Sequence, residues 1–302
     1  MGTPLRTAKK LLLGHEIEHM ITTVHSNQTE AAKHIETSQS RIAALIDGTG
    51  RITVGDLERL ATKLGFTDQA YLDALLELRR DNHKRGFWTT GHNRAYAEAL
   101  RLLVDLEKHA DLLRTAEVEI MPGLVQCEAY IHALHEHDET TTTDTRDHQT
   151  DPNTVTVTDK VQARLARQQV LLTNNPPEFR AVLSESCLRR EYGGRKVMLE
   201  QINHLITLSQ KPNIQIQIMP FTLTPRRTGM ANRFVLLRVP SPGAAGPLEM
   251  AYVENEEDIR YLDDKTAFAA RDTVWSRLSA AALNTDDSRT FMEHITRTFR
   301  RT

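Results

Sequence analysis

Residues 27–48 read NQTEAAKHIETSQSRIAALIDG, and this stretch predicts two short helices joined by a tight connection. Asn27 stands where it can cap the first helix, with Glu30 three residues later as the partner of a capping box. Ser38 stands where it can cap the second helix, which ends at Gly48. The second helix places its apolar residues on one buried face: Ile42, Leu45 and Ile46.

Three more helices complete a compact all-α unit over residues 1–85. Before the central pair, apolar residues recur on one helix face from Leu13 to Val24. After it, TVGDLERLATKLG repeats the pattern with Thr53 as its cap, and TDQAYLDALLELRR forms a fifth helix. The periodicity then breaks at DNHKRGFWTTGHN, where we assign residues 86–92 as a linker.

The first helix contains HEIEH, the spacing at which two His of a zinc protease bind the metal while the Glu acts as base. His15, Glu16, Glu18 and His19 lie off the apolar stripe of this helix, and no third ligand stands out nearby. We therefore expect a solvated helix face, with no bound metal.

Residues 93–302 predict a second domain, an α+β fold in which helices surround a small β-sheet. NIQIQIM alternates apolar and polar residues, as a strand with one buried face does. RFVLLRV is continuously apolar, as a central strand would be. The polar, Thr- and Asp-rich stretch near 135–158 is expected to be a mobile loop. The other expected elements are strands at FRAVLS and LEMAYVE and helices at 93–114, after MPG at 121–123, at 195–210, 264–282 and 287–299.

Composition points to a globular cytoplasmic protein. The chain has 302 residues, of which 39% are hydrophobic and 26% charged. No apolar run is long enough to span a bilayer, and the start of the chain lacks the pattern of a signal peptide. Cys127 and Cys187 form no CxxC motif and are expected to fill the core. With a net charge of −2, any binding of nucleic acid has to come from a local surface.

The stretch 27–48 resembles the lambda-repressor/Cro-like helix-turn-helix of the xenobiotic-response-element (XRE) regulators. The second domain resembles a C-terminal domain found behind that helix-turn-helix in many actinobacterial regulators, described as antitoxin-like and of unassigned biochemistry. The resemblance implies a transcriptional regulator that binds double-stranded DNA as a homodimer and receives a small-molecule effector or a small partner protein. The stretches that carry it are MPGLVQCEAY, VQARLARQ, VLSESCLRREYGG, QINHLITLSQKPNIQIQIMPF and AYVENEEDIRYL.

A helix-turn-helix reads base edges with the first turns of its second helix. Gln39 has the donor and acceptor that suit adenine, and Arg41 suits guanine or a phosphate. Gln28 matches the family position that anchors a phosphate beside helix N-terminal amides. The full set of expected DNA-binding residues is Gln28, Ser38, Gln39, Ser40 and Arg41, together with Arg6, Lys9 and Lys10. The last three lie near the start of the chain and are expected to contact the phosphate backbone of the DNA.

Several departures from the family pattern reduce the number of side chains that can contact DNA. Ala43 and Ala44 stand where relatives often carry Ser-Arg, and Glu18 and His19 stand where they carry Arg. The first 85 residues hold seven Arg and five Lys against eleven acidic residues, so the unit is hardly basic. A further exchange, Ile21 and Ile46 for a family Arg–Glu pair, replaces an ion pair by apolar residues at both positions.

The second domain carries no P-loop, GxSxG or GxGxxG in the right context, so we expect neither a cofactor nor catalytic residues from motifs. Arg226 and Arg227 lie in a loop that could meet an anionic partner or be solvated. Six polar or aromatic residues inside apolar motifs are candidates for a ligand pocket, or else satisfied core residues: Glu107, Gln126, Tyr130, Glu185, Tyr252 and Glu254.

Two functions follow from these patterns. The first is a DNA-binding transcriptional regulator whose C-terminal domain senses a ligand or a small partner protein. The alternative is a ligand-binding or catalytic protein whose degenerate helix-turn-helix no longer binds DNA. The weakly charged first domain and the Ala43–Ala44 pair keep the alternative open.

Overall fold

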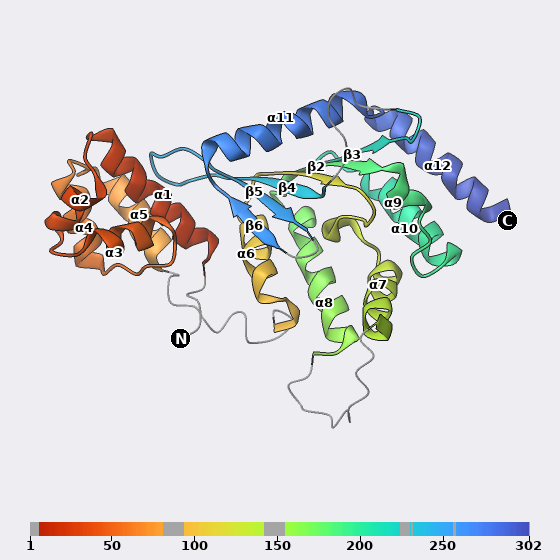
Figure 1. The fold of residues 1–302 in the computed structure, drawn as a ribbon, viewed down its shortest axis with the longest axis horizontal. Coiled ribbons are helices and arrows are strands. Elements are labelled where there is room, and N and C mark those ends of the chain that lie inside the picture. Colours follow the sequence, from red (N-terminus) through yellow and green to blue (C-terminus); the bar gives the residue numbers. More distant parts are fainter. Residues whose placement is uncertain are drawn as a thin grey trace. The chain divides into compact units, whose positions relative to one another are not determined.

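The computed structural model describes residues 6–80, 94–141, 155–223, 230, 232–255 and 258–301 (Figure 1). Contacts divide the chain into two compact units. The first, which we call the helical unit, comprises Met1–Thr89, Glu98–His109 and Arg238–Leu248. The second, the sheet unit, comprises Thr90–Ala97, Ala110–Leu237 and Glu249–Thr302. The linker predicted at 86–92 and the loop residues Arg226 and Arg227 lie outside the described residues.

The helical unit contains the five predicted helices. They are α1 (Ala8–Thr23), α2 (Gln28–His34), α3 (Gln39–Ile46), α4 (Val54–Lys63) and α5 (Gln69–Arg80). The side chains of Asn27, Ser38 and Thr53 cap α2, α3 and α4, each accepting a hydrogen bond from a backbone N–H three residues on. The expected capping box at α2 is only half formed, because the Glu30 carboxylate accepts from the Ser26 hydroxyl instead.

A glycine lets α1 and α3 approach closely. A Cβ built on Gly14 of α1 would lie 2.2 Å from the carbonyl oxygen of Ile46 and 2.7 Å from that of Leu45. Both oxygens belong to the backbone of α3, so no side-chain rotation can make room. Gly14 therefore fixes how α3 sits against the rest of the unit. Ile21 of α1 is buried and Ile46 of α3 is partly buried.

The sheet unit is built on a six-stranded mixed sheet in the order β3-β2-β1-β4-β5-β6. Strands β1, β2 and β3 are parallel, and β6 runs antiparallel to β5. The strands are β1 (Leu112–Glu117), β2 (Glu178–Ser184), β3 (Ile214–Met219), β4 (Phe234–Val239), β5 (Leu248–Glu254) and β6 (Ile259–Leu262). The structure thus confirms the expected fold class, helices followed by a mixed sheet with helices around it.

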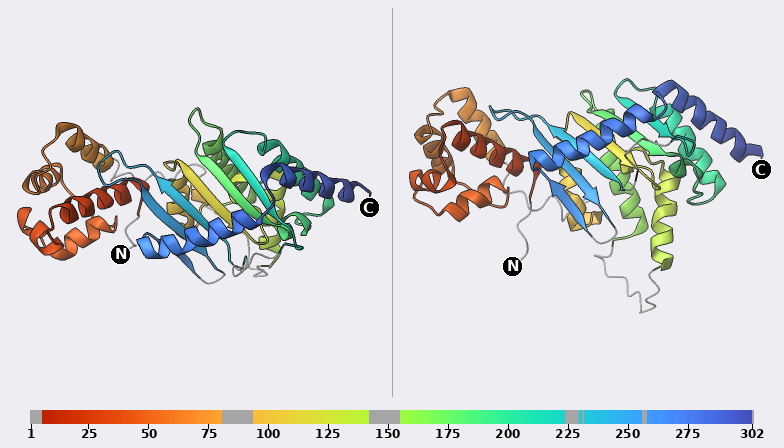
Figure 2. Two further views of the ribbon diagram at one scale, coloured as in Figure 1. Left: turned by 90° about the horizontal axis from the view of Figure 1, so that it is seen from above. Right: turned by 45° about the horizontal axis from the view of Figure 1, so that its top comes forward.

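Helices cover both faces of this sheet (Figures 1 and 2). The parallel strands are joined through helices, as crossover connections require: α7 (Glu128–Thr141) and α8 (Val157–Gln168) between β1 and β2, and α9 (Glu185–Arg189) and α10 (Arg195–Leu208) between β2 and β3. Short 3-10 turns at Gly123–Val125 and Gln169–Leu172 accompany them. Helices α11 (Lys265–Ala281) and α12 (Thr285–Arg301) close the chain, as predicted.

The helix α11 packs on one face of the sheet, opposite α7 and α8 (Figure 1). The apolar core between α11 and the sheet contains Ala116 of β1 and Phe268, Trp275 and Leu278 of α11. Arg114 of β1 adds an ion pair with Asp272 and stacks over the Trp275 ring at 5.2 Å. Because successive side chains of a strand point to opposite faces, residues 115 and 117 point away from α11.

Two expectations about this unit were wrong. The helix expected over 93–114 ends sooner, because α6 spans Glu98–Glu107 and β1 begins at Leu112. The buried Leu113 lies seven residues after Leu106, so the apolar period of α6 runs on into the strand and hides the boundary. The loop expected near 135–158 is also shorter, since α7 extends to Thr141 and α8 begins at Val157, with residues 142–154 outside the described part.

Candidate functional site

The first turn of α3 presents the expected base-reading residues to solvent. Gln39, Ser40 and Arg41 are exposed, and Ser38 accepts a hydrogen bond from the Arg41 backbone N–H at 3.3 Å. The amide of Gln39 donates to the Gln28 carbonyl oxygen at 2.5 Å, which joins the starts of α2 and α3. This contact leaves the Gln39 Oε1 as an acceptor and one N–H as a donor, the pair that an adenine edge requires.

The three cations near the chain start are less available than the sequence suggested. Lys10 is buried, with 7% of its surface exposed, so it does not stand on the outer surface where we expected a phosphate contact. Arg6 lies 3.5 Å from Asp47, and Lys9 lies 3.6 Å from Glu77. An exposed ion pair is weak and can be exchanged for a phosphate, whereas a buried ammonium is not at the surface to make one.

The HEIEH segment of α1 was expected to be solvated, but its Glu16 is not. Glu16 is fully buried, and its carboxylate accepts hydrogen bonds from the Tyr71 hydroxyl at 2.8 Å and from the backbone N–H groups of Ala244 and Ala245 at 3.0 and 3.1 Å. The Ser241 hydroxyl donates to the same carboxylate. All of these residues belong to the helical unit.

The flanking histidines are partly buried rather than solvated. The Nε2 of His15 is buried without a hydrogen-bond partner, and the His19 ring meets Phe66 edge-on. Among the described residues, no group of three or more His, Cys, Asp or Glu side chains is arranged to hold a metal ion. The physical role of Glu16 is therefore that of a tertiary anchor, which sequence periodicity could not reveal because its partners lie far along the chain.

A polar cluster lies on the sheet face that points away from α11. It comprises Thr115 and Glu117 of β1, Tyr252 and Glu254 of β5, and Arg233 just before β4, and we call it the Glu117 cluster. The Thr115 hydroxyl donates to Glu117 Oε1 at 3.0 Å, and the Tyr252 hydroxyl donates to Glu254 Oε2 at 2.5 Å. One cation, which precedes β4, therefore faces two carboxylates on the strands that flank β4, namely β1 and β5.

Arg233 connects the two carboxylates without saturating them. Its Nη1 lies 3.3 Å from Glu254 Oε2, and its Nε lies 3.6 Å from Glu117 Oε2. That Nε is buried and makes no hydrogen bond. The side chains of Arg233 and Glu254 are about one third exposed, whereas Glu117 is almost completely buried. The cluster therefore opens to solvent on the side of Arg233 and Glu254.

Burial controls the charge of Glu117. Desolvation raises the pKa of its carboxyl from 4.5 to about 7, against the opposing effects of the Arg233 charge and the Thr115 hydrogen bond. Desolvation and the Glu254 carboxylate raise the pKa of Tyr252, which keeps this phenol protonated. Desolvation acts to lower the pKa of Arg233, but the two carboxylates outweigh it and raise the value overall. At neutral pH the cluster can hold or release one proton.

We expect replacement of Glu117 by glutamine to remove a pH dependence of stability. In the wild type the folded state binds more protons than the unfolded state between about pH 4.5 and about pH 7, so stability falls as pH rises through this window and is constant above it. The shift corresponds to about 3 kcal/mol at most. Urea unfolding at pH 5 and pH 8 measures the free energy of unfolding of both proteins. Relative to the wild type, Glu117→Gln should be more stable at pH 8 than at pH 5.

The exposed Glu249 of β5 provides the matched control for this experiment, because Glu249→Gln makes the same chemical change at a solvated position. Its unfolding free energy should follow that of the wild type across the pH range. Parallel curves for Glu117→Gln and the wild type would contradict the assignment of a proton to buried Glu117.

The six polar or aromatic candidates, which the sequence offered either as a ligand pocket or as satisfied core residues, have their printed partners in several different places. Tyr252 and Glu254 belong to the Glu117 cluster, and the charge of Glu117 also acts on Tyr130. Gln126 instead donates to the Met121 carbonyl at 2.7 Å and accepts from Arg164 of α8 at 2.9 Å. Gln126 thus stabilises the turn that precedes α7.

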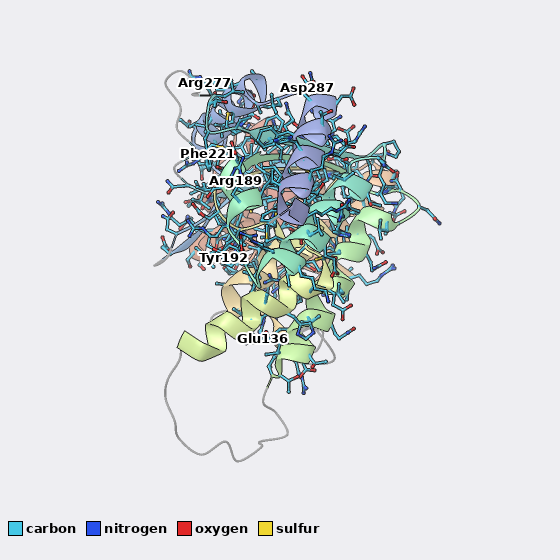
Figure 3. The ribbon with its side chains drawn as sticks, turned by 90° about the vertical axis from the view of Figure 1, so that its right-hand side faces the viewer. Glu136, Arg189, Tyr192, Phe221, Arg277 and Asp287 are labelled. Atoms are coloured by element: carbon cyan, nitrogen blue, oxygen red, sulfur yellow. The ribbon has the colours of Figure 1, made fainter. Side chains whose placement is uncertain are left out.

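Other members of the expected pocket have local partners. Tyr130 accepts from the Met121 N–H at 3.4 Å, and Glu107 is buried in α6, in the helical unit. Glu185 pairs with Arg189 and accepts from the Phe221 N–H at 2.8 Å; Figure 3 shows Arg189 and Phe221 close together on one side of the sheet unit. These contacts stabilise the turn around Met121 and the short helix α9.

Sequence reasoning missed Glu117, Arg233 and Thr115. Glu117 ends a strand whose start had been assigned to a helix, so the face on which it lies was unknown. Arg233 was included in an apolar strand, yet it precedes that strand and points to the polar cluster. Cys127 and Cys187 are buried free thiols, as expected, and Cys187 donates to the Glu117 carbonyl oxygen at 3.5 Å.

No helix in the described part of the chain is both long and apolar enough to cross a membrane. Comparison with curated proteins found no match, and neither did comparison with solved structures. One family model, described as a domain of unknown function (DUF5753), matches residues 100–294. That stretch covers more than half of the chain and includes every strand of the sheet. The chain therefore belongs to the DUF5753 family.

Proposed function

We propose that this protein is a DNA-binding transcriptional regulator whose C-terminal domain senses a ligand or a small partner protein. The observation that carries the proposal is the hydrogen bond between Gln28 and Gln39, which presents an oriented amide at the first turn of α3. Arg41 lies exposed beside it, and the caps of α2 and α3 are formed. An ordered amide and a guanidinium at the exposed start of a helix suit contacts in a major groove.

The proposed complex contains two copies of the chain. One α3 offers only a few base-reading side chains, and the helical unit has almost as many acidic as basic residues within 1–85. A small set of contacts of this kind supplies little affinity. A second copy of the chain doubles the number of contacts and reads a second half-site. We therefore propose a cytoplasmic homodimer on double-stranded DNA.

We expect the binding of DNA to be modest and strongly dependent on salt. Few phosphates are neutralised, so the measured affinity for an operator fragment should fall by one or more powers of ten between about 50 and about 200 mM salt. Fluorescence anisotropy with a labelled fragment measures this slope directly. Tight binding that is insensitive to salt would exclude recognition through these residues.

The second candidate function is favoured by a different observation. Glu117 has a pKa of about 7, which suits a group that transfers a proton near neutral pH, and it lies beside a partly exposed arginine. A ligand-binding or catalytic role for the sheet unit uses this cluster and needs no DNA. Native mass spectrometry of the purified protein tests it: a small molecule retained by the wild type, lost in Glu117→Gln and accompanied by no DNA binding supports this candidate over the first.

A further inference from the structure

The guanidinium of Arg233 lacks acceptors for its hydrogen-bond donors. An arginine side chain carries five N–H donors in a planar fork. The Nε of Arg233 is buried without a hydrogen-bond partner, and its ion pairs with Glu117 and Glu254 are 3.6 and 3.3 Å long. The Glu254 oxygen that it faces also accepts from the Tyr252 hydroxyl, so two donors compete for one acceptor. Within the described part of the sheet unit, the fork of Arg233 is therefore left to a further partner.

The contacts of Thr115 fit a protonated Glu117 better than an ionised one. The Thr115 hydroxyl has a single hydrogen, yet its oxygen lies 3.0 Å from Glu117 Oε1 and 3.2 Å from the Phe234 carbonyl oxygen. A protonated Glu117 donates to the Thr115 oxygen and leaves that hydrogen for Phe234, so both contacts form at once. An ionised Glu117 takes the hydrogen itself, and Phe234 loses it. Geometry and burial therefore favour the same neutral state.

The charges around Glu117 show what its proton changes. The groups of the described chain whose charges interact with it are Arg233 ahead of β4, Glu254 of β5, Arg167 of α8, Tyr130 of α7 and Cys187 of α9. Burial raises the pKa of the Tyr130 phenol and of the Cys187 thiol, so both stay neutral near pH 7. A proton on Glu117 therefore leaves two positive charges and one negative charge among these groups.

We infer that Arg233 binds a singly charged oxyanion, a carboxylate or a phosphodiester group, and that Glu117 takes up a proton from solvent as the anion binds. The anion supplies the acceptor that Arg233 lacks, through charge-assisted hydrogen bonds. The Arg233 side chain is about one third exposed, so an anion can reach it from solvent. The Glu254 carboxylate beside it disfavours a group with two negative charges.

The binding of the anion depends on pH with a defined sign. The inference rests on the proposed ligand-sensing role of the C-terminal domain and names the class of ligand. An anion beside Arg233 raises the pKa of Glu117 further by like-charge repulsion, so the bound state holds the proton. Below about pH 7 the free protein already holds it, and the affinity is constant. Above about pH 7 each binding event takes up one proton, so the dissociation constant rises up to tenfold per pH unit.

The experiment titrates the purified chain with sodium acetate, and separately with dimethyl phosphate, from about pH 6 to about pH 9, while NMR follows the Phe234 amide. Both probes keep a single negative charge throughout, and the one that binds more tightly identifies the group as carboxylate or phosphodiester. For the wild type we expect a dissociation constant that is flat up to about pH 7 and then rises. Glu117→Gln is neutral at every pH, so it should keep the low-pH constant over the whole range.

Two further variants serve as controls. Arg233→Gln should lose the binding of both probes, whereas Arg260→Gln removes the same charge from an exposed position on β6 and should keep it. Glu117→Gln still decides the question if Arg233→Gln fails to fold. The inference is overturned by a wild-type dissociation constant that is equal at both ends of the pH range, by the same rise with pH in Glu117→Gln, or by saturation with neither probe.

The titration contains no DNA, so its outcome is separate from that of the proposed function. If neither probe binds but the chain selects particular DNA fragments, the anion site fails and the regulator function stands. If the predicted pH dependence is found but no selective DNA exists, the anion site stands and the regulator function fails. The second candidate function expects a ligand to be lost in Glu117→Gln, whereas an anion held by Arg233 is retained, so this variant also separates the two.

Discussion

Replacement of Gly14 by alanine is expected to destabilise the helical unit strongly. The new Cβ would stand 2.2 Å from the Ile46 carbonyl oxygen, so α1 and α3 have to separate. Overpacking of this kind costs about 1–3 kcal/mol or more, which outweighs the gain of about 1 kcal/mol from placing alanine in a helix. Thermal or urea unfolding followed by circular dichroism should show a clear loss of stability.

Gly55 provides the opposite case for comparison. It lies in α4, and a Cβ at this position would meet nothing within 4 Å. Gly55→Ala should leave stability unchanged or raise it slightly. If Gly14→Ala behaves like Gly55→Ala, the close approach of α3 to α1 is not the feature that fixes α3.

Removal of Gln39 and Arg41 together is expected to abolish most of the selectivity for DNA sequence. The two side chains can make up to two base-edge contacts, each worth roughly 1–3 kcal/mol of discrimination. Selectivity between operator and unrelated DNA should therefore fall by one or more powers of ten in Gln39→Ala/Arg41→Ala. Both residues are exposed, and Ser38 still caps α3, so the unfolding temperature should change little.

Gln69→Ala/Arg80→Ala is the matched control for this experiment. Gln69 begins α5 as Gln39 begins α3, Arg80 ends α5, and both are exposed. The control removes the same side-chain types and the same charge, so it carries the same general loss of electrostatic attraction. If the two double variants have equal selectivity, α3 does not read the DNA sequence.

The sequence predicted the features of this chain that depend on near neighbours. The caps Asn27, Ser38 and Thr53 each bond to a backbone group three residues away, so local residue type was sufficient. The helices of the first 80 residues and four of the six strands followed from apolar periodicity. Strand β1 was missed because Leu113 continues the apolar period of α6.

The features that were missed depend on groups distant in sequence. Glu16 lies on a helix position that periodicity marks as solvated, and it is buried only because residues 241–245 supply its donors. Glu117 acquires its raised pKa from a sheet that brings together residues more than a hundred positions apart. Lys10, by contrast, was assigned to the DNA surface from its charge alone, and burial removes it from that surface.

The most direct test of the central claim is selection from genomic DNA. The purified chain is incubated with fragmented genomic DNA at about 50 mM salt, where phosphate contacts are only weakly screened, and the bound fragments are sequenced. The account predicts enrichment of a small set of fragments with two half-sites one helical turn, about 10 bp, or a multiple of it apart. It also predicts loss of this enrichment in Gln39→Ala/Arg41→Ala. Uniform recovery of fragments by the wild type, or the same enrichment by the variant, would contradict it.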